Sequence, residues 1–299
     1  MRFQDLTSSR PAMRLGIFLG RHVPRRVGYG LSRFVAAAIA RRKPQIYWTV
    51  RANLRQILGP DAGDETLHEM TRHVFFHAGQ TYYDFFNALG QPPEVIATAV
   101  HIPKSLIAHL KAEIERGRGI LLLASHISNF DLAGLVIGMQ GFPIQMLSLA
   151  NPEAGFQLMN YLRAKSGYEV TPITPDSLRA AIRRLKNGGI VLTGMDRPIP
   201  EDRMLIEFFG RQAYLPVGPV RLALMTGAAV VMGSCYHKPG EGYALQITAP
   251  VEMVRTGDRR QDILTNARRL AVILEDHVRV RPEQWMMFHP FWPDQEDAG

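Results

Sequence analysis

Short apolar runs alternate with helical stretches between residues 119 and 279, and this alternation restricts the fold more than any other feature. The run Gly119–Ala124 reads GILLLA, which is typical of a strand buried on both faces. Strands are expected at 119–124, 144–149, 169–173, 190–194, 229–237 and 243–248, with helices at 129–140, 153–166, 177–186, 219–226 and 260–279. Strands that alternate with helices form a mostly parallel sheet covered by helices, so the predicted class is α/β.

The first part of the chain has a helical pattern instead. Residues 12–58 read as helices that are interrupted at Pro24 and Pro44 and end at the Gly59-Pro60 break. A long helix is expected over residues 64–90. We therefore predict a single domain over residues 1–299, with a basic amphipathic helical segment at 1–60 and an α/β body at 61–299.

Composition excludes several classes of protein. Apolar residues make up 46% of the chain and charged residues 21%, as in a globular domain. Cys235 is the single cysteine of the sequence, which excludes an intrachain disulfide and a thiolate metal cluster. The first ten residues are too polar for a secretory signal, and no run approaches the roughly 18–20 apolar residues of a spanning helix. We expect a protein that is cytosolic or lies on a membrane face.

The positive charge is concentrated at the N-terminus. Residues 1–55 hold 12 of the 35 Lys and Arg residues but one of the 27 acidic residues, Asp5. Such an arm suits nucleic acid or anionic lipid. An apolar stripe at helical spacing favours lipid, since a basic helix with an apolar face is typical of an interfacial anchor. The alternative is that the stripe packs on the rest of the domain. It consists of Val27, Leu31, Phe34, Val35 and Ala38.

A histidine and an aspartate follow the first buried strand, in the segment 125–131 (SHISNFD). Ligands of open α/β sheets collect at the carboxyl ends of strands, so His126 stands at a favourable place for chemistry. A histidine oriented by a carboxylate takes a proton from an attacking hydroxyl. The bend between strand and helix brings Asp131 back towards His126. Alternatively, Ser128 and Asp131 form a helix-capping box and have no catalytic role.

His126-x4-Asp131 after an apolar strand resembles the motif of the lysophospholipid and glycerolipid acyltransferase superfamily. The order of further landmarks over residues 70–292 is similar to the bacterial late acyltransferases of lipid A biosynthesis and the related phosphatidylinositol mannoside acyltransferases. These landmarks are Tyr161-Leu162-Arg163 before Gly167, Asp196-Arg197, Phe208-Phe209-Gly210, Pro216-Val217-Gly218-Pro219, Thr226-Gly227-Ala228 and Pro282-Glu283-Gln284-Trp285.

The resemblance implies a peripheral enzyme on the cytoplasmic face of the cell membrane that moves a fatty acyl group to a lipid hydroxyl. The donor is an acyl thioester of coenzyme A or acyl carrier protein, without cofactor, metal or nucleic acid. His126 is then the general base, and Asp131 orients it. Arg163 stabilises an oxyanion or a phosphate, or is an ordinary surface residue. Asp196 orients the acceptor hydroxyls, or pairs with Arg163 or Arg197.

Further positions are predicted to bind substrate. Ser128, Asn129 and Arg197 flank the catalytic positions. Phe208 and Phe209 line an acyl groove in one interpretation and belong to the core in the other. Gly218 lies where a new helix begins, and a helix N-terminus binds phosphate.

The sequence motifs expected for other functions are absent or incomplete. A Gly-x-Ser-x-Gly elbow and both nucleotide-binding glycine loops are missing from the sequence. Cys235 with His237 would make a thiol enzyme, and His73 with His77 a metal pair that lacks a third ligand nearby. A lysophospholipid or glycerol-phosphate-type acyltransferase and a non-catalytic lipid-binding protein stay open as alternatives. Relatives can have a histidine in the closing segment, where this chain has Trp285-Met286-Met287, and its role is left open.

Overall fold

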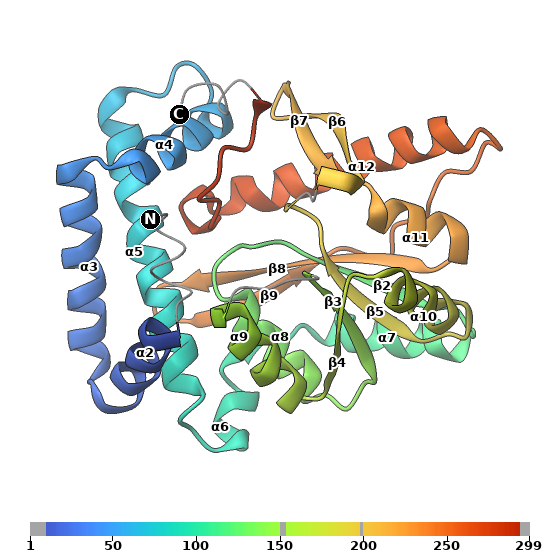
Figure 1. The fold of residues 1–299 in the computed structure, drawn as a ribbon, viewed down its shortest axis with the longest axis horizontal. Coiled ribbons are helices and arrows are strands. Elements are labelled where there is room, and N and C mark those ends of the chain that lie inside the picture. Colours follow the sequence, from blue (N-terminus) through green and yellow to red (C-terminus); the bar gives the residue numbers. More distant parts are fainter. Residues whose placement is uncertain (1–9, 150–153, 198–199, 294–299) are drawn as a thin grey trace.

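The computed structural model describes residues 10–149, 154–197 and 200–293 (Figure 1). The helices are α2 (Arg10–His22), α3 (Arg25–Arg42), α4 (Gln45–Leu58), α5 (Asp64–Ala88), α6 (Pro93–Ala97), α7 (Lys104–Glu115), α8 (Phe130–Gly138), α9 (Ala154–Lys165), α10 (Pro175–Lys186), α11 (Gly218–Thr226) and α12 (Arg259–Val280), with single 3-10 turns at η1 (Pro200–Asp202) and η2 (Pro282–Gln284). The strands are β1 (Val100–His101), β2 (Ile120–Ala124), β3 (Ile144–Ser148), β4 (Tyr168–Pro172), β5 (Ile190–Gly194), β6 (Arg203–Phe208), β7 (Arg211–Pro216), β8 (Ala229–Lys238) and β9 (Gly242–Ile247).

A seven-stranded sheet in the order β1-β9-β8-β2-β5-β3-β4 forms the centre of the fold. Every pair of neighbouring strands in it is parallel except β8 and β9, which are joined by a tight turn. The predicted α/β class with a mostly parallel sheet is therefore confirmed. Each strand expected from the apolar runs is present with small differences at its ends.

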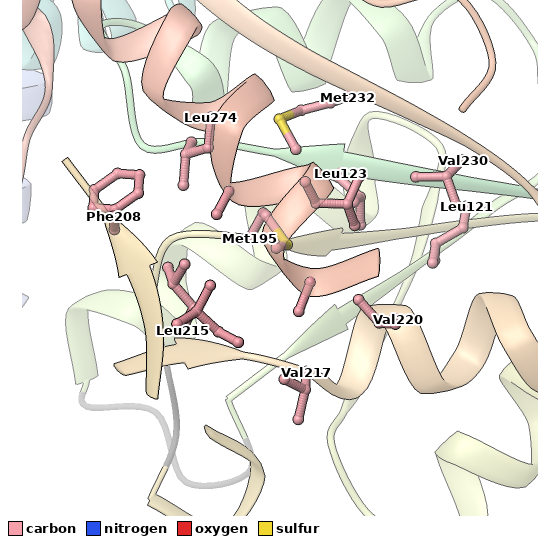
Figure 2. Close-up of a cluster of buried hydrophobic side chains, with 14 of the residues drawn as sticks. Leu121, Leu123, Met195, Phe208, Leu215, Val217, Val220, Val230, Met232 and Leu274 are labelled. Carbon is pink, nitrogen blue, oxygen red and sulfur yellow. The ribbon is translucent and has the colours of Figure 1, made fainter. Parts of the chain in front are cut away.

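The sheet separates two apolar layers because successive side chains of a strand point to opposite faces. Leu121 and Leu123 of β2 pack into a large cluster with α10, α11 and α12, and Figure 2 shows part of this cluster. Leu122 points the other way and packs in a second cluster with Leu106 of α7 and Ile137 of α8. β2 is thus buried on both faces, which explains its uninterrupted apolar sequence.

The β6–β7 hairpin and α7 are elements that the sequence interpretation missed. Ile206 and Phe208 of β6 are buried, while Leu205 and Glu207, which each precede one of them, are exposed. This alternation marks a half-buried strand. Phe209 and Gly210 both have positive φ, at 50° and 73°. Two residues in that conformation form the tight turn that joins antiparallel strands. The hairpin lies against α12 (Figure 1).

The N-terminal helices α2, α3 and α4 pack against α5 (Figure 1), and α3 buries small residues. The buried residues of α3 are Gly28, Ser32, Ala36 and Ala40. The predicted apolar stripe faces outward instead, and Phe34 is 71% exposed. The alternative that this stripe packs on the domain is therefore wrong. Within the described residues, no helix combines the length and the hydropathy required to cross a membrane.

The glycines of α3 provide a test of this packing. A Cβ on Gly28 would lie 2.4 Å from the ring of Tyr83, whose hydroxyl donates to the carbonyl of Val23 at 2.6 Å. A Cβ on Gly30 would meet no heavy atom within 4 Å. We expect Gly28→Ala to lower the free energy of unfolding by about 1–3 kcal/mol through overpacking. Gly30→Ala should raise it by up to about 1 kcal/mol through helix propensity. Urea unfolding of both variants measures the difference, and equal effects would contradict the α3–α5 contact.

Candidate active site

The register of two parallel strands brings His126 and Asp196 together. β2 and β5 are neighbours, and Ala124 of β2 pairs with Gly194 of β5. His126 lies two residues after Ala124, and Asp196 lies two residues after Gly194. Both side chains therefore leave the sheet at its carboxyl edge, where ligands of open α/β sheets bind.

His126 and Asp196 form a close pair. Nδ1 of His126 lies 2.6 Å from Oδ1 of Asp196, and the backbone N–H of His126 donates to Oδ2 at 2.8 Å. Because an ionised carboxylate only accepts, Nδ1 carries the proton and Nε2 keeps its lone pair. The side chain of His126 is 19% exposed while that of Asp196 is fully buried. The ring edge of Phe130 contacts the imidazole, with 4.7 Å between ring centroids.

Burial and neighbouring charges set the protonation of this pair. Burial lowers the pKa of His126 below its ordinary 6.5, and the positive charge of Arg197 lowers it further, against the opposing effect of Asp196. Burial by itself raises the pKa of Asp196, but the charge and hydrogen bonds of His126 outweigh this and hold that pKa at about 2. At neutral pH the carboxylate is ionised and the imidazole is a neutral base.

Asp131 does not orient His126, contrary to the sequence prediction. One of its carboxylate oxygens accepts from Nε and Nη2 of Arg163 in α9, at 3.0 and 2.6 Å. The reason is the start of α8, where Asn129 is the N-cap and accepts from the backbone N–H of Leu132. Asp131 is then the second residue of the helix and faces α9 rather than the imidazole. The alternative capping box of Ser128 and Asp131 is wrong for the same reason.

Ser128 and Asn129 hold the loop between β2 and α8 and do not line the cavity described below. Both are buried. Ser128 has a φ of 47°, and its backbone N–H donates to the carbonyl of Gln284 at 2.8 Å. The amide of Asn129 donates to the carbonyl of Thr81 in α5 at 3.2 Å. The prediction that these two residues contact a substrate is replaced by a role in shaping the loop.

An apolar cavity of about 260 Å³ begins at His126 and continues between the sheet and helices α7 and α8. Polar groups gather at one end, where His126, Asp131, Arg163 and Arg197 line it. The cavity exists because small side chains stand on this face of the strands and on α8. They are Ala124, Gly194, Gly233, Ala133 and Gly134. Larger apolar residues surround the inner part, namely Leu106, Leu122, Ile137, Met146, Leu192, Val231, Leu245 and Ile247.

Two arginines supply positive charge beside His126. Arg163 also donates to Oδ1 of Asn160 at 3.0 Å, so two partners fix its guanidinium. Arg197 donates from Nη2 to the carbonyl of Met286 at 3.2 Å, and its buried Nε has no hydrogen-bond partner among the described residues. Neither forms the ion pair with Asp196 that the sequence interpretation left open. Both line the cavity and suit an anion that forms next to the imidazole.

Three other predicted substrate contacts lie elsewhere. Phe208 and Phe209 belong to the core cluster, where Phe208 is fully buried against Trp285 and Trp292. The backbone N–H of Gly218 bonds the carboxylate of Asp202, and a Cβ on Gly218 would overlap that carboxylate. The protein's own acidic group therefore occupies the N-terminus of α11, which leaves no place there for a phosphate.

The structure does not support the thiol site or the metal site that the sequence suggested. Burial raises the pKa of the Cys235 thiol to about 12, and a thiol in that state is a poor nucleophile. Burial lowers the pKa of His77 to about 4, and its Nδ1 contacts Gln80 rather than His73. The described part of the chain holds no group of three or more metal-ligating side chains.

The family profile described as "Bacterial lipid A biosynthesis acyltransferase" matches residues 12–293. A protein of Mycobacterium tuberculosis named "Phosphatidylinositol mannoside acyltransferase" is 27% identical over 188 residues, which cover 62% of this chain and 58% of the relative. The "Lipid A biosynthesis lauroyltransferase" of Escherichia coli is 26% identical over 267 residues, which cover 88% of this chain and 83% of the relative. The match to the mycobacterial protein thus spans less than two thirds of that protein's length.

The pair of His126 and Asp196 predicts a titration that distinguishes the two aspartates. An NMR titration of the His126 ring should give a pKa below 6.5 in the unmodified protein. Asp196→Asn should lower this pKa further, because it removes the negative charge that favours the imidazolium. Asp131→Asn should lower it less, since that carboxylate is neutralised by Arg163. A larger effect of Asp131→Asn would restore the orienting role predicted from the sequence.

Proposed function

Since the chain belongs to the bacterial lipid A biosynthesis acyltransferase family, we propose that it transfers a fatty acyl group from a thioester donor to a hydroxyl of a glycolipid. One observation carries this proposal. The unprotonated Nε2 of His126 stands at the polar end of a cavity whose walls are mostly apolar. A base beside a mostly apolar chamber suits a reaction between a hydroxyl and a fatty acyl thioester.

The proposed reaction uses His126 as acid and base in turn. The acceptor oxygen attacks the thioester carbonyl carbon while Nε2 of His126 takes the hydroxyl proton. The tetrahedral intermediate carries its negative charge on the former carbonyl oxygen, which Arg163 and Arg197 stabilise. The C–S bond then breaks, and His126 returns the proton to the departing sulfur. Asp196 holds the imidazole and stabilises its charged form throughout, while Asp131 holds Arg163.

The acyl chain is assigned to the cavity between the sheet and helices α7 and α8. Its inner walls are leucine, isoleucine, valine and methionine side chains, so an alkyl chain that enters is removed from water without leaving polar groups unpaired. The carbonyl carbon then lies at the polar end beside His126. The names of the relatives support a sugar-bearing lipid as acceptor.

Turnover of the purified protein tests the proposal. Acyl-CoA and acyl carrier protein should each be offered with phosphatidylinositol mannoside or a lipid A precursor, and product lipid measured by mass spectrometry. His126→Ala should lower kcat about 100- to 10,000-fold, the range for loss of a general base. His73→Ala removes a histidine outside the cavity lining and should leave kcat unchanged. A His126→Ala enzyme with half the normal activity would refute the mechanism.

We further infer that α2 and α3 dock the protein on an anionic membrane, because a lipid acceptor stays in its bilayer. The exposed apolar residues of these helices include Phe18, Val27, Leu31 and Phe34. They lie in the N-terminal region with its excess of basic residues over acidic ones. Apolar burial and attraction to anionic lipid act together at such a surface, and each basic side chain contributes about 1 kcal/mol.

Vesicle co-sedimentation tests the docking surface. The triple variant Arg26→Glu, Arg33→Glu and Phe34→Ser should lose binding to anionic vesicles, and high salt should weaken binding of the unmodified protein without abolishing it. Arg25 is excluded from the variant because it bonds Tyr29 and pairs with Asp84, so its loss would disturb folding.

The matched control carries the same change in charge and also loses an exposed apolar side chain, on α12. It combines Arg259→Glu, Arg260→Glu and Val272→Ser, all at exposed positions. This variant should bind vesicles like the unmodified protein. Equal loss in both variants, or equal binding to neutral and anionic vesicles, would contradict docking through α3.

A further inference from the structure

The indole of Trp285 contacts the carboxylate that holds His126. Nε1 of Trp285 donates to Oδ2 of Asp196 at 2.9 Å, and Trp285 is 3% exposed. We propose that Trp285 is a positioning residue for the acyl transfer: its N–H fixes the Asp196 carboxylate and, through it, the orientation of the His126 base. This inference rests on the proposed function, which it extends to a residue whose role the sequence left open.

Three donors account for both oxygens of the carboxylate. Oδ1 bonds Nδ1 of His126, while Oδ2 accepts from the backbone N–H of His126 and from the indole of Trp285. Rotation of the carboxylate would break the bonds to Oδ2 and leave that oxygen of a fully buried charge without a partner, which is costly. An indole nitrogen only donates, so it bonds Asp196 in its ionised form and never competes for the proton of His126.

The segment around Trp285 also binds directly to the loop between β2 and α8, which carries His126 and is called the histidine loop below. Trp285 forms an antiparallel bridge with Ile127, and the backbone N–H of Met286 donates to the carbonyl of His126 at 2.9 Å. Gln284 accepts from the backbone N–H of Ser128 on the other side. One short stretch of chain thus holds both members of the pair, His126 through its backbone and Asp196 through the indole.

Aromatic packing keeps the indole in place. Trp285 lies 5.1 Å from Phe291 and 6.2 Å from Phe208, measured between ring centroids. Trp292 belongs to the same cluster and is 1% exposed, but its Nε1 donates to the carbonyl of Phe208 at 3.2 Å. Trp292 is therefore a matched control: it has an equally buried indole with a hydrogen bond to an uncharged backbone group.

The experiment compares Trp285→Phe with Trp292→Phe in the full-length protein. Each variant removes one buried indole hydrogen bond and retains an aromatic ring. Trp285→Phe should lower kcat about tenfold or more with little change in KM, because a charge-assisted bond to the catalytic pair is lost. The acid limb of its kcat/KM profile should move to higher pH, since a less stabilised Asp196 charge favours the imidazolium of His126.

Trp292→Phe should lose similar stability in urea but keep the kcat of its folded fraction and an unshifted pH profile. If Trp285→Phe keeps both the kcat and the pH profile of the unmodified protein, the inference is overturned. It is also overturned if both variants lose activity only in proportion to the folded fraction.

A second measurement needs no variant and no turnover. The chain has three tryptophans, and the indole N–H signal of Trp285 should follow the titration of His126, while that of Trp292 should not. If this coupling is present but no acyl transfer occurs, the proposed function fails and the coupling of Trp285 to His126 stands. If transfer occurs without the coupling, the proposed function survives and the positioning role of Trp285 fails.

Discussion

The parallel pairing of β2 with β5 is the constraint on which the site depends. In-register hydrogen bonds from Ile120 to Ala124 place the ends of the two strands side by side, so that the residues just beyond them meet. The His126–Asp196 pair therefore needs no flexible loop to bring it together. A shift of one residue in this register would turn the side chains to opposite faces and separate the pair. The pairing that buries β2 in the sheet thus also determines the geometry of the candidate base.

The two faces of the same sheet are packed differently. On the face covered by α12, apolar side chains form a large core cluster that includes the fully buried Leu121 and Val230 (Figure 2). On the face covered by α7 and α8, small residues such as Gly194 and Gly233 leave a chamber. Close packing gives the rigidity that a buried charged pair requires, while the chamber gives room for an apolar substrate. This division follows from the period of two along each strand.

The C-terminal segment completes the site from the opposite end of the chain. The indole of Trp285 donates a hydrogen bond to Asp196, and the carbonyl of Met286 accepts one from Arg197. About 89 residues separate the partners in each case. Asn53 of α4 in turn donates to the carbonyls of Met287 and His289. The N-terminal helices, the sheet edge and the closing segment are therefore joined by direct hydrogen bonds around the histidine loop.

The sequence by itself determined the α/β class, the position of nearly every strand of the large sheet, and the choice of His126 as the candidate base. These features are local, because apolar runs and the helices between them have periods that can be read within a few residues. The sequence also marked Asp131, Arg163, Asp196 and Arg197, but it did not determine their partners.

Only the tertiary structure decided that Asp196 rather than Asp131 holds the histidine. Asp131 lies near His126 in sequence and Asp196 does not, but their placement depends on strand register and on the N-cap at Asn129, which turns Asp131 towards α9. The tertiary structure also decided that Phe208 is a buried core residue and Phe34 an exposed one, although both lie in apolar stretches of the sequence. Such choices depend on contacts between distant segments, and a linear pattern does not contain those contacts.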